Sequence, residues 1–218
     1  MKNEAGNLAA FFARLVPVLE SVADTYEILC INDGSSDDTL PQLLLARERN
    51  PHIRIADLSR NFGKEAALTC GIELARGDVV IPMDADLQHP PEVIPDMVRH
   101  WREGFEVVLA KRQSREAEHW ARRTTAGWFY RLQNRISEVD IPADVGDFRL
   151  MDRKVIEALK RLPERRRFMK GLFAWAGFRQ TTVTFVCEPR YAGSSKFSGW
   201  RLWNFALEGI TSFSTVPL

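Results

Sequence analysis

Two aspartates separated by one residue, Asp84 and Asp86, follow an apolar run and form a pattern suited to binding a metal. In an extended turn, alternate residues can present their carboxylates at neighbouring positions. Two close carboxylates repel each other, and a divalent cation relieves that repulsion. Because Mg²⁺ or Mn²⁺ commonly combines one or two protein carboxylates with substrate phosphates, the pattern predicts a metal-assisted phosphate site. The alternative is a loop of solvated aspartates.

A second polar segment, Asn32-Asp33-Gly34-Ser35, follows an earlier apolar run. Glycine allows the backbone to approach a ligand closely. Asp33 could accept hydrogen bonds from a base or a ribose, as acidic residues do in nucleotide-binding folds. An ordinary Asx turn, with Ser36 capping the helix that follows, would explain the same residues equally well.

Signatures of several other enzyme classes are absent from the sequence. Neither Gly-x-Gly-x-x-Gly nor Gly-x-x-x-x-Gly-Lys-Ser/Thr occurs, which argues against a dinucleotide oxidoreductase and a P-loop NTPase. The serine-hydrolase pattern Gly-x-Ser-x-Gly and the zinc-peptidase pattern His-Glu-x-x-His are also missing. The three cysteines, Cys30, Cys70 and Cys187, are widely spaced, so we expect neither a disulfide framework nor a cysteine-ligated zinc site.

The chain has 218 residues, of which 45% are hydrophobic and 27% are charged, values typical of a folded globular protein. Its net charge is only +1, but residues 1–100 carry 9 Lys/Arg and 16 Asp/Glu, whereas residues 101–218 carry 21 and 13. The acidic half suits a metal and the basic half suits anions; two solvated surfaces of opposite sign would show the same asymmetry. No run of 18 uncharged apolar residues occurs, so we expect no membrane-spanning helix.

The elements that must position these residues alternate between helix and strand in the first half. We expect helices over residues 7–23, 39–49, 64–75 and 91–103, and strands over residues 26–31, 53–58, 78–83 and 106–110. This order is typical of a mostly parallel sheet, in which ligands bind at the carboxyl ends of the strands. The loops over residues 32–36 and 84–89 would both lie there.

The second half is less regular. We expect helices over residues 119–137, 154–162 and 200–213, a strand over residues 181–186, a polar turn over residues 144–149 and a loop over residues 192–198. The last helix would carry Trp200, Trp203, Leu207 and Ile210 on one stripe. This stripe suits a membrane interface with aromatic anchors and equally suits packing on the domain core. The basic run Arg165-Arg166-Arg167 suits an anionic membrane surface or a solvated turn.

Seven segments carry motifs in a fixed order: Asn32–Ser35, Leu58–Glu65, Met83–Gln88, Gly146–Met151, Gly177–Gln180, Ser194–Ser198 and Gly209–Ser214. Together they resemble the family 2 glycosyltransferases, which have the GT-A fold. More narrowly, they resemble the polyprenyl-phosphate sugar transferases, such as dolichol-phosphate mannosyltransferase and bactoprenol glucosyltransferase. The resemblance covers nearly the whole chain, and the motifs are far more specific together than singly.

The resemblance implies an α/β fold of the GT-A type, with a mostly parallel twisted sheet and helices on both faces. It implies a catalytic domain over residues 1–198, with a donor half at about 1–110 and an acceptor half at about 111–198. Residues 199–218 would form an amphipathic interfacial helix that leads to transmembrane helices absent from this chain. The family begins with an apolar strand, but here Met1-Lys2 runs directly into Asn3-Glu4, so we expect the first strand to be missing.

The resemblance also implies roles for individual residues. Asp33 would contact the nucleotide base, and Lys64 would lie near the nucleotide. Asp147 stands where the family places a catalytic or acceptor-orienting carboxylate. The nucleotide-binding set is Asn32, Asp33, Gly34, Ser35, Lys64, Asp84 and Ala85. The ligands of Mg²⁺ or Mn²⁺ would be Asp84, Asp86 and Gln88. The catalytic set would be Asp147, Arg112, Arg190 and Lys196, of which the three basic residues would gather around the acceptor phosphate and the departing diphosphate.

The implied reaction is an inverting, metal-dependent transfer of a sugar from a nucleotide-sugar donor to a polyprenyl-phosphate acceptor. UDP-glucose is the favoured donor and GDP-mannose the next. A phosphate monoester has a second pKa of about 6 and is largely dianionic at neutral pH, so Asp147 need not act as a base. The implied location is the cytoplasmic face of the cell membrane, as part of cell-envelope synthesis, and association into a homo-oligomer stays open.

Three other functions remain in competition. One is a family 2 transferase with a polysaccharide or protein acceptor, and another is an inactive, shortened scaffold at the membrane. The third is a nucleic-acid binder that uses the basic half. We expect no nucleic-acid partner, because recognisable binding motifs are lacking and the Asp-x-Asp loop would repel phosphates without a metal.

Overall fold

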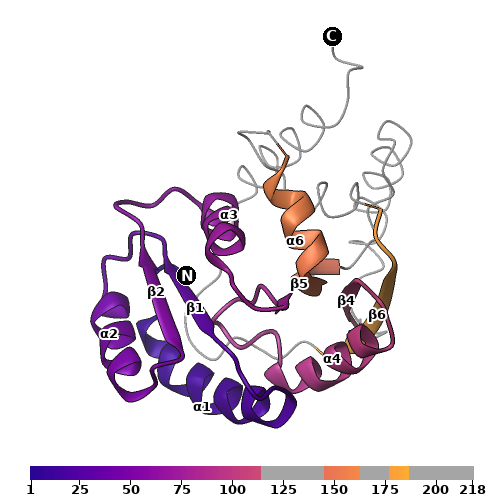
Figure 1. The fold of residues 1–218 in the computed structure, drawn as a ribbon. Coiled ribbons are helices and arrows are strands. Elements are labelled where there is room, and N and C mark those ends of the chain that lie inside the picture. Colours follow the sequence, from indigo (N-terminus) through magenta and orange to yellow (C-terminus); the bar gives the residue numbers. More distant parts are fainter. Residues whose placement is uncertain (114–144, 163–176, 187–218) are drawn as a thin grey trace, which may run out of the picture.

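The computed structural model of the chain describes residues 1–113, 145–162 and 177–186 (Figure 1). The chain begins with α1 (Ala5–Val22) and then alternates β1 (Ile28–Asn32), α2 (Thr39–Arg49), β2 (Ile53–Asp57) and α3 (Lys64–Leu74). β1 and β2 pair in parallel, with Ile28 opposite Ile53 and Asn32 opposite Asp57. The helices and loop expected over residues 119–137, 192–198 and 200–213 lie outside the described residues.

A second sheet has the strand order β3-β5-β4-β6. Its strands are β3 (Val79–Val80), β4 (Val107–Arg112), β5 (Val145–Asp152) and β6 (Gln180–Phe185), and its helical neighbours are the short 3₁₀ helix η1 (Pro91–Val93), α4 (Ile94–Arg102) and α6 (Arg153–Lys160). β4 and β6 are parallel, whereas β5 runs antiparallel to both β3 and β4. The α/β class is confirmed, and the strand pairing is mixed.

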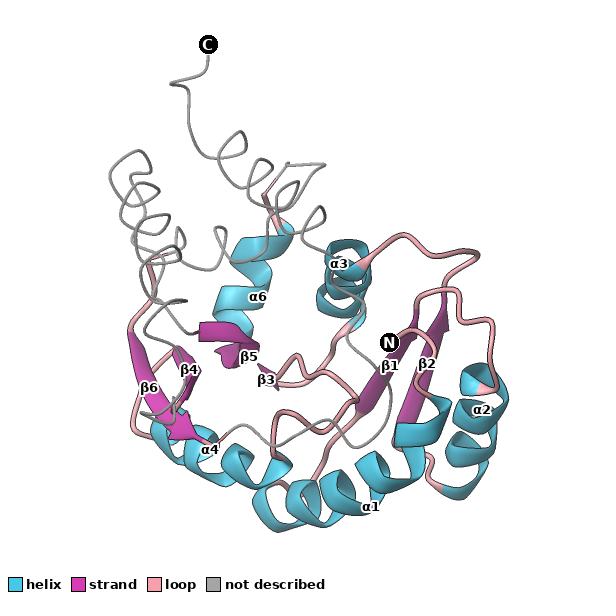
Figure 2. Ribbon diagram, turned by 180° about the vertical axis from the view of Figure 1, so that it is seen from behind, coloured by secondary structure: helices cyan, strands magenta, loops and turns pink. Residues whose placement is uncertain are grey.

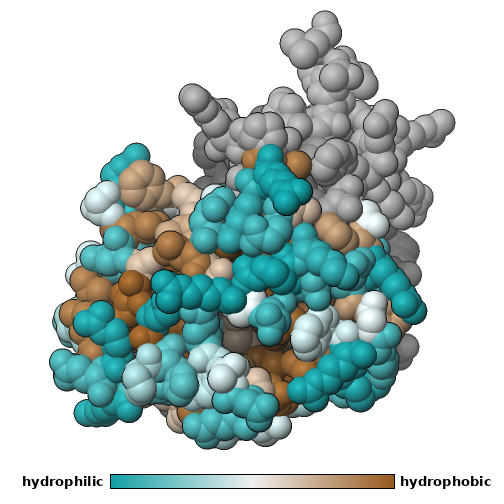
Figure 3. All heavy atoms as spheres, viewed as in Figure 1, coloured by the Kyte–Doolittle hydropathy of each residue, from teal (hydrophilic) through white to brown (hydrophobic). Residues whose placement is uncertain are grey.

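Helices cover both faces of the strands, as expected (Figures 1 and 2). Alternation along β4 shows how the two faces are divided: Val108 and Ala110 pack with residues of α1, α2 and α4, whereas Val107 and Leu109 pack with residues of α3 and α6. This division follows from the two-residue period of a strand. On the surface, apolar side chains gather over α2 and β2, while the surface over α6 is mostly hydrophilic (Figure 3).

The polar turn expected over residues 144–149 is wrong, because this segment belongs to β5. The strand lies between β3 and β4, where Phe148 and Leu150 face one core and Met151 faces the other. All three side chains are at most 1% exposed. Polar residues such as Asp147 and Arg149 gave the segment the composition of a turn. Pairing with two strands distant in sequence satisfies its backbone instead.

The two sheets are separate within the described chain. One side of β1 pairs with β2, and near its carboxyl end the other side is contacted by Met1. The Met1 ammonium donates a hydrogen bond to the Ile31 carbonyl oxygen at 2.7 Å, and the Asp33 N–H donates to the Met1 carbonyl oxygen at 2.8 Å. This is the hydrogen-bond pattern of a single parallel bridge. No strand precedes α1 in the described residues.

Among the helices that the structure describes, α1 has a length and composition that would allow it to cross a membrane. Its Leu8, Phe11 and Leu15 side chains are buried in the core. On the same helix, Arg14 forms an ion pair with Glu92 at 2.8 Å. Such a distribution is typical of an amphipathic helix packed on the core of a domain.

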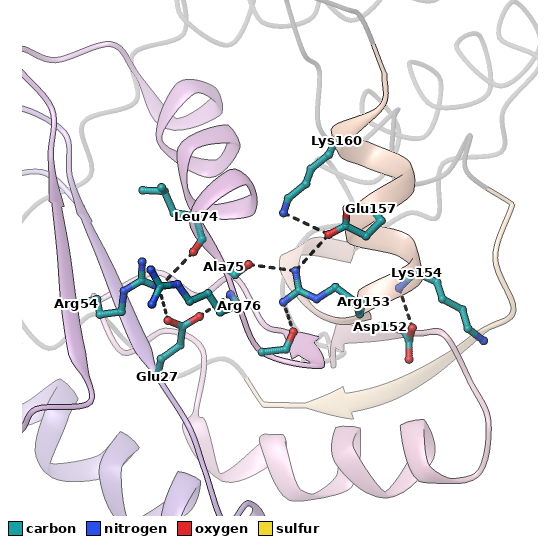
Figure 4. A network of polar contacts seen from close by, with 11 residues as sticks. Glu27, Arg54, Leu74, Ala75, Arg76, Asp152, Arg153, Lys154, Glu157 and Lys160 are labelled. Carbon is teal, nitrogen blue, oxygen red and sulfur yellow. Dashed lines mark hydrogen bonds and ion pairs between the residues drawn. The ribbon is translucent and has the colours of Figure 1, made fainter.

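A network of arginine contacts fastens the helices to the strand ends (Figure 4). Glu27, just before β1, accepts a hydrogen bond from the Arg76 N–H at 2.7 Å and forms a short ion pair with Arg54 of β2. Arg153, at the start of α6, donates to the carbonyl oxygens of Ala75, at 3.1 Å, and Gly77. The segment after α3 is therefore bound by Glu27, which precedes β1, and by Arg153, which follows β5.

The Glu27 contacts predict a pH-dependent stability. Burial alone would raise the pKa of Glu27, but hydrogen bonds from Arg54 and the Arg76 backbone outweigh burial, and the pKa lies below its ordinary value of 4.5. A carboxyl with a lowered folded-state pKa stabilises the native state above pH 4.5, and the effect disappears as the pH falls through the folded-state pKa. We expect Glu27→Gln to lower the free energy of unfolding by about 1 kcal/mol at pH 7 and by less at pH 3.

Urea unfolding at the two pH values would measure this difference. Glu20→Gln is the matched control, because Glu20 is an exposed carboxylate, and it should change the stability at neither pH. An equal loss for Glu27→Gln at both pH values would contradict the prediction.

The central position of β5 predicts a large effect of truncating its core side chains. Leu150 is 0% exposed, so Leu150→Ala leaves a cavity and should lower the free energy of unfolding by about 2–5 kcal/mol. Leu45→Ala removes the same atoms from a residue that is 52% exposed and should change it by less than about 0.5 kcal/mol. Urea unfolding of both variants checks this, and similar losses would rule out β5 as a central strand.

Candidate functional site

Three segments meet at the edge of the molecule where β1 and β4 end. The loop after β3 provides Asp84, the first residue of α3 provides Lys64, and the amino end of β5 provides Asp147. The Lys64 ammonium (Nζ) lies 3.0 Å from Asp84 Oδ2 and 2.8 Å from Asp147 Oδ2. Because β5 is antiparallel to β4, its amino end lies beside the carboxyl end of β4. This contact joins the expected donor and acceptor halves.

Charge pairing dominates this cluster. Burial alone would lower the pKa of Lys64, but the carboxylates of Asp84 and Asp147 outweigh burial and raise the pKa above its ordinary value of 10.5. Burial alone would raise the pKa of Asp84, but Lys64 outweighs it and lowers the pKa below 3.8. At neutral pH the site therefore holds an ammonium between carboxylates.

The Asp33 carboxylate accepts hydrogen bonds from backbone groups of the chain itself. Its Oδ1 accepts a hydrogen bond from the Phe62 N–H at 2.7 Å, and its Oδ2 accepts one from the Gly63 N–H at 3.0 Å. With its amide oriented to satisfy both partners, Asn61 also donates to Asp33 Oδ2 at 2.7 Å. Asp33 thereby fixes the loop between β2 and α3. Its contact with a nucleotide base stays a prediction.

Asn32 and Ser35 also hold this part of the site together. The Ser35 hydroxyl donates to Asn32 Oδ1 at 2.6 Å, and Asn32 Nδ2 donates to Asp57 Oδ1 at 2.7 Å. The Asn3 N–H in turn donates to the Ser35 hydroxyl oxygen at 2.9 Å. Asp57, which ends β2, was not expected at the site. Only the pairing of β1 with β2 places it opposite Asn32.

The backbone at position 34 requires a glycine. Its φ is +58°, a backbone conformation that favours glycine. A Cβ atom there would lie 2.4 Å from the carbonyl carbon of Arg60 and 2.5 Å from the backbone nitrogen of Asn61. The loop before α3 therefore packs directly against the backbone after β1.

The Asp84–Gln88 segment forms a tight turn. Ala85, Asp86 and Leu87 are 5%, 8% and 3% exposed, and the Gln88 N–H donates to Asp86 Oδ1 at 3.1 Å. Leu87 has a φ of 62°, which costs about 1–3 kcal/mol for a non-glycine residue and persists only where the surroundings enforce it. Burial of the Leu87 side chain provides that enforcement.

The donor set of this turn suits a hard cation. Asp84, Asp86 and Gln88 offer only oxygen ligands, the type that Mg²⁺ and Mn²⁺ prefer. Within residues 1–113, 145–162 and 177–186, no group of three His, Cys, Asp or Glu side chains is arranged to hold a metal ion. In this structure Lys64 supplies the positive charge beside Asp84.

The remaining expected site residues are distributed as follows. Arg112 is exposed at the end of β4, near the cluster because Lys111 lies opposite Val145. Arg190 and Lys196 lie outside the described residues.

Two further residues support the site and were given no role by the sequence analysis. Arg149 is 5% exposed and donates to the Gly146 carbonyl oxygen at 2.6 Å. Burial lowers the pKa of Arg149 to about 10, opposed by the Asp147 carboxylate, so the guanidinium stays charged at neutral pH. His89 stacks on Phe148 with ring centroids 4.9 Å apart and also meets Phe185 edge-on. Arg149 lies on β5 and His89 stacks on Phe148 of the same strand, so both positions become evident only once β5 is placed in the sheet.

Comparisons with known proteins identify relatives of the chain. Residues 1–160 match a family model described as glycosyl transferase family 2. An uncharacterised glycosyltransferase of Synechocystis is 57% identical over 218 residues, which are 100% of this chain and 69% of that protein. The bactoprenol glucosyl transferase of Shigella phage SfV is 48% identical over 216 residues, which are 99% of this chain and 70% of that protein.

A solved structure supports the fold assignment. Glucosyl-3-phosphoglycerate synthase of Mycobacterium tuberculosis, in complex with Mn²⁺, UDP-glucose and phosphoglyceric acid, has a TM-score of 0.62 and 16% sequence identity. The match covers 97% of this chain and 75% of that one. At this identity the likeness concerns the fold, and it confirms the GT-A architecture expected from the sequence.

The contact of Gly34 with the following loop predicts a position-specific effect of a methyl group. Gly34→Ala and Gly63→Ala both place alanine at a positive φ, but a Cβ at Gly63 would meet nothing within 4 Å. Gly63 has a φ of 98° and a ψ of 168°, so Gly63→Ala should cost only the backbone strain, about 1–3 kcal/mol. Gly34→Ala should cost more, because the Arg60–Asn61 backbone must also move. Thermal unfolding of the two variants measures the difference, and equal midpoints would contradict the packing described.

Proposed function

The chain belongs to glycosyl transferase family 2, and on that premise we propose that it transfers a sugar from a nucleoside diphosphate sugar to a polyprenyl phosphate. The favoured donor is UDP-glucose, with GDP-mannose next. The choice of acceptor and sugar is supported by the 48% identity to a protein named as a bactoprenol glucosyl transferase.

The observation that carries the proposal is the convergence of Asp84 and Asp147 on Lys64. Asp84 belongs to the donor half and Asp147 to the acceptor half. A sugar transferase needs the reacting atoms of its donor and acceptor held about 3–3.5 Å apart, and here the two expected halves meet at a single ammonium.

Asp84, Asp86 and Gln88 would hold Mg²⁺ or Mn²⁺. When bound, such an ion neutralises negative charge that develops on the departing diphosphate. The mycobacterial synthase that shares the fold was solved with Mn²⁺ and UDP-glucose, which supports the use of a divalent cation by this architecture.

The residues of the chain position the two substrates. The Asp33 contacts hold the loop before α3 against β1, which keeps Lys64 at the donor site. A phosphate acceptor is already largely dianionic at neutral pH, so Asp147 has no proton to remove. Its carboxylate instead holds Lys64 toward the acceptor side, and Arg112 adds positive charge at the same edge. A single displacement inverts the configuration of the anomeric carbon.

We propose that the reaction takes place at the cytoplasmic face of the cell membrane, since a polyprenyl phosphate is held in a bilayer by its apolar chain. Residues 101–218 carry 21 Lys/Arg against 13 Asp/Glu, and each basic residue near an anionic bilayer contributes about 1 kcal/mol of attraction. Arg165–Arg167 and the helix expected over residues 200–213, which would provide this contact, lie outside the described residues.

The donor site predicts joint stabilisation by metal and nucleotide. Thermal unfolding with Mn²⁺ plus UDP should occur at a higher midpoint than with either alone, since ligands that bind the native state stabilise it. GDP in place of UDP should give a smaller shift. Asp84→Asn/Asp86→Asn should lose the joint shift, whereas Asp96→Asn, an exposed carboxylate on α4, should retain it.

Transfer itself is measured with radiolabelled UDP-glucose and a polyprenyl phosphate in detergent micelles. We expect a metal-dependent glucolipid product, and loss of product in Asp84→Asn/Asp86→Asn. Joint binding without transfer to the lipid would favour another acceptor or a scaffold. If the wild-type chain unfolds cooperatively but Mn²⁺ plus UDP does not raise its unfolding midpoint, the proposed donor site is wrong.

A further inference from the structure

Lys64 places a positive charge beside Asp84, a carboxylate that a divalent cation would also use. Its ammonium lies within 3.0 Å of one oxygen of Asp84 and within 2.8 Å of one oxygen of Asp147. Asp84 is also one of the residues that would hold the metal. The same carboxylate therefore faces two competing cations, one of them built into the chain.

We propose that Lys64 is an internal counter-ion that keeps a divalent metal from binding until a nucleoside diphosphate arrives and draws the ammonium away from Asp84. This inference rests on the proposed function and deepens it: it assigns Lys64 the role of coupling metal binding to nucleotide binding. The ligand it specifies is a metal–nucleoside diphosphate pair, and not the metal alone.

Electrostatics supports this coupling. An ammonium and a divalent cation sharing one carboxylate repel each other strongly at such short distances. A diphosphate brings negative oxygens that can accept hydrogen bonds from the ammonium and can also complete the ligand shell of the metal. The nucleotide thus removes the competitor and adds ligands in one event. By linkage, the metal must strengthen nucleotide binding by the same factor.

The mobility required of Lys64 fits its position. Its backbone begins α3 directly after Gly63, but its side chain is 50% exposed, whereas that of Asp147 is 14% exposed. A four-carbon stem allows the ammonium to move by several ångströms without disturbing the helix. Asp147 is fixed within β5, so Lys64 can leave Asp84 and keep its second partner.

Direct measurement of metal affinity tests the proposal. Free Mn²⁺ can be followed by electron paramagnetic resonance during titration of wild type and Lys64→Met, with and without UDP. Wild type should bind Mn²⁺ weakly alone and much more tightly with UDP. Lys64→Met, which removes the charge and keeps most of the length of the side chain, should bind Mn²⁺ without UDP at least tenfold more tightly than wild type. UDP should then increase its Mn²⁺ affinity by a smaller factor.

A gain of affinity separates this role from a structural one, because structural damage would weaken binding. Mn²⁺ alone should also raise the unfolding temperature of Lys64→Met but not that of wild type. Lys64→Arg, which retains the charge, should restore the wild-type pattern. Lys154→Met removes a lysine whose side chain is 74% exposed on α6 and should leave all affinities unchanged. If Lys64→Met does not unfold cooperatively, Lys64→Gln takes its place.

The outcomes separate this inference from the proposed function. If wild type binds Mn²⁺ and UDP jointly but Lys64→Met binds Mn²⁺ alone no more tightly than wild type, the counter-ion role is wrong and the donor site stands. Equal Mn²⁺ affinity of wild type with and without UDP would also overturn the coupling. If wild type binds no Mn²⁺ even with UDP, both the donor site and the counter-ion role are wrong.

Discussion

The antiparallel placement of β5 between β3 and β4 is the constraint on which the site depends. It buries Phe148 and Leu150 against one set of helices and Met151 against the other, so the strand cannot shift by one residue without exposing its apolar side chains. The same placement brings the amino end of the strand, with Asp147, to the edge where β4 ends. A packing requirement thereby fixes the position of a charged group.

The donor side depends on hydrogen bonds rather than on apolar packing. Asp33 receives backbone N–H groups from the loop before α3, and Asn32 bridges to Asp57 across the parallel pair. Each of these buried polar groups has a partner, as burial demands. Their satisfaction holds Gly34 close to the Arg60–Asn61 backbone and gives Lys64 a fixed origin at the start of α3.

Opposite charges then connect the two sides. Lys64 lies between the Asp84 carboxylate of the loop after β3 and the Asp147 carboxylate of β5. Under the proposed function, such a site would accept an anionic donor and release an anionic product. An arrangement of exchangeable ion pairs allows both, because each pair can be replaced by a pair with the ligand.

Local periodicity and short motifs in the sequence predicted the helices of the first half, the strands β1, β2 and β4, the polar loops around Asp33 and Asp84, and membership of a glycosyltransferase family. The strand expected over residues 78–83 is wrong in extent, because only Val79–Val80 pair with β5. Only the tertiary structure decided that residues 145–152 form a strand and that Asp147 meets Lys64. β5 is stabilised by pairing with residues 34 to 73 positions earlier in the chain, from Lys111 opposite Val145 to Val79 opposite Asp152. Polar residues within it, such as Asp147 and Arg149, resemble a turn when judged locally.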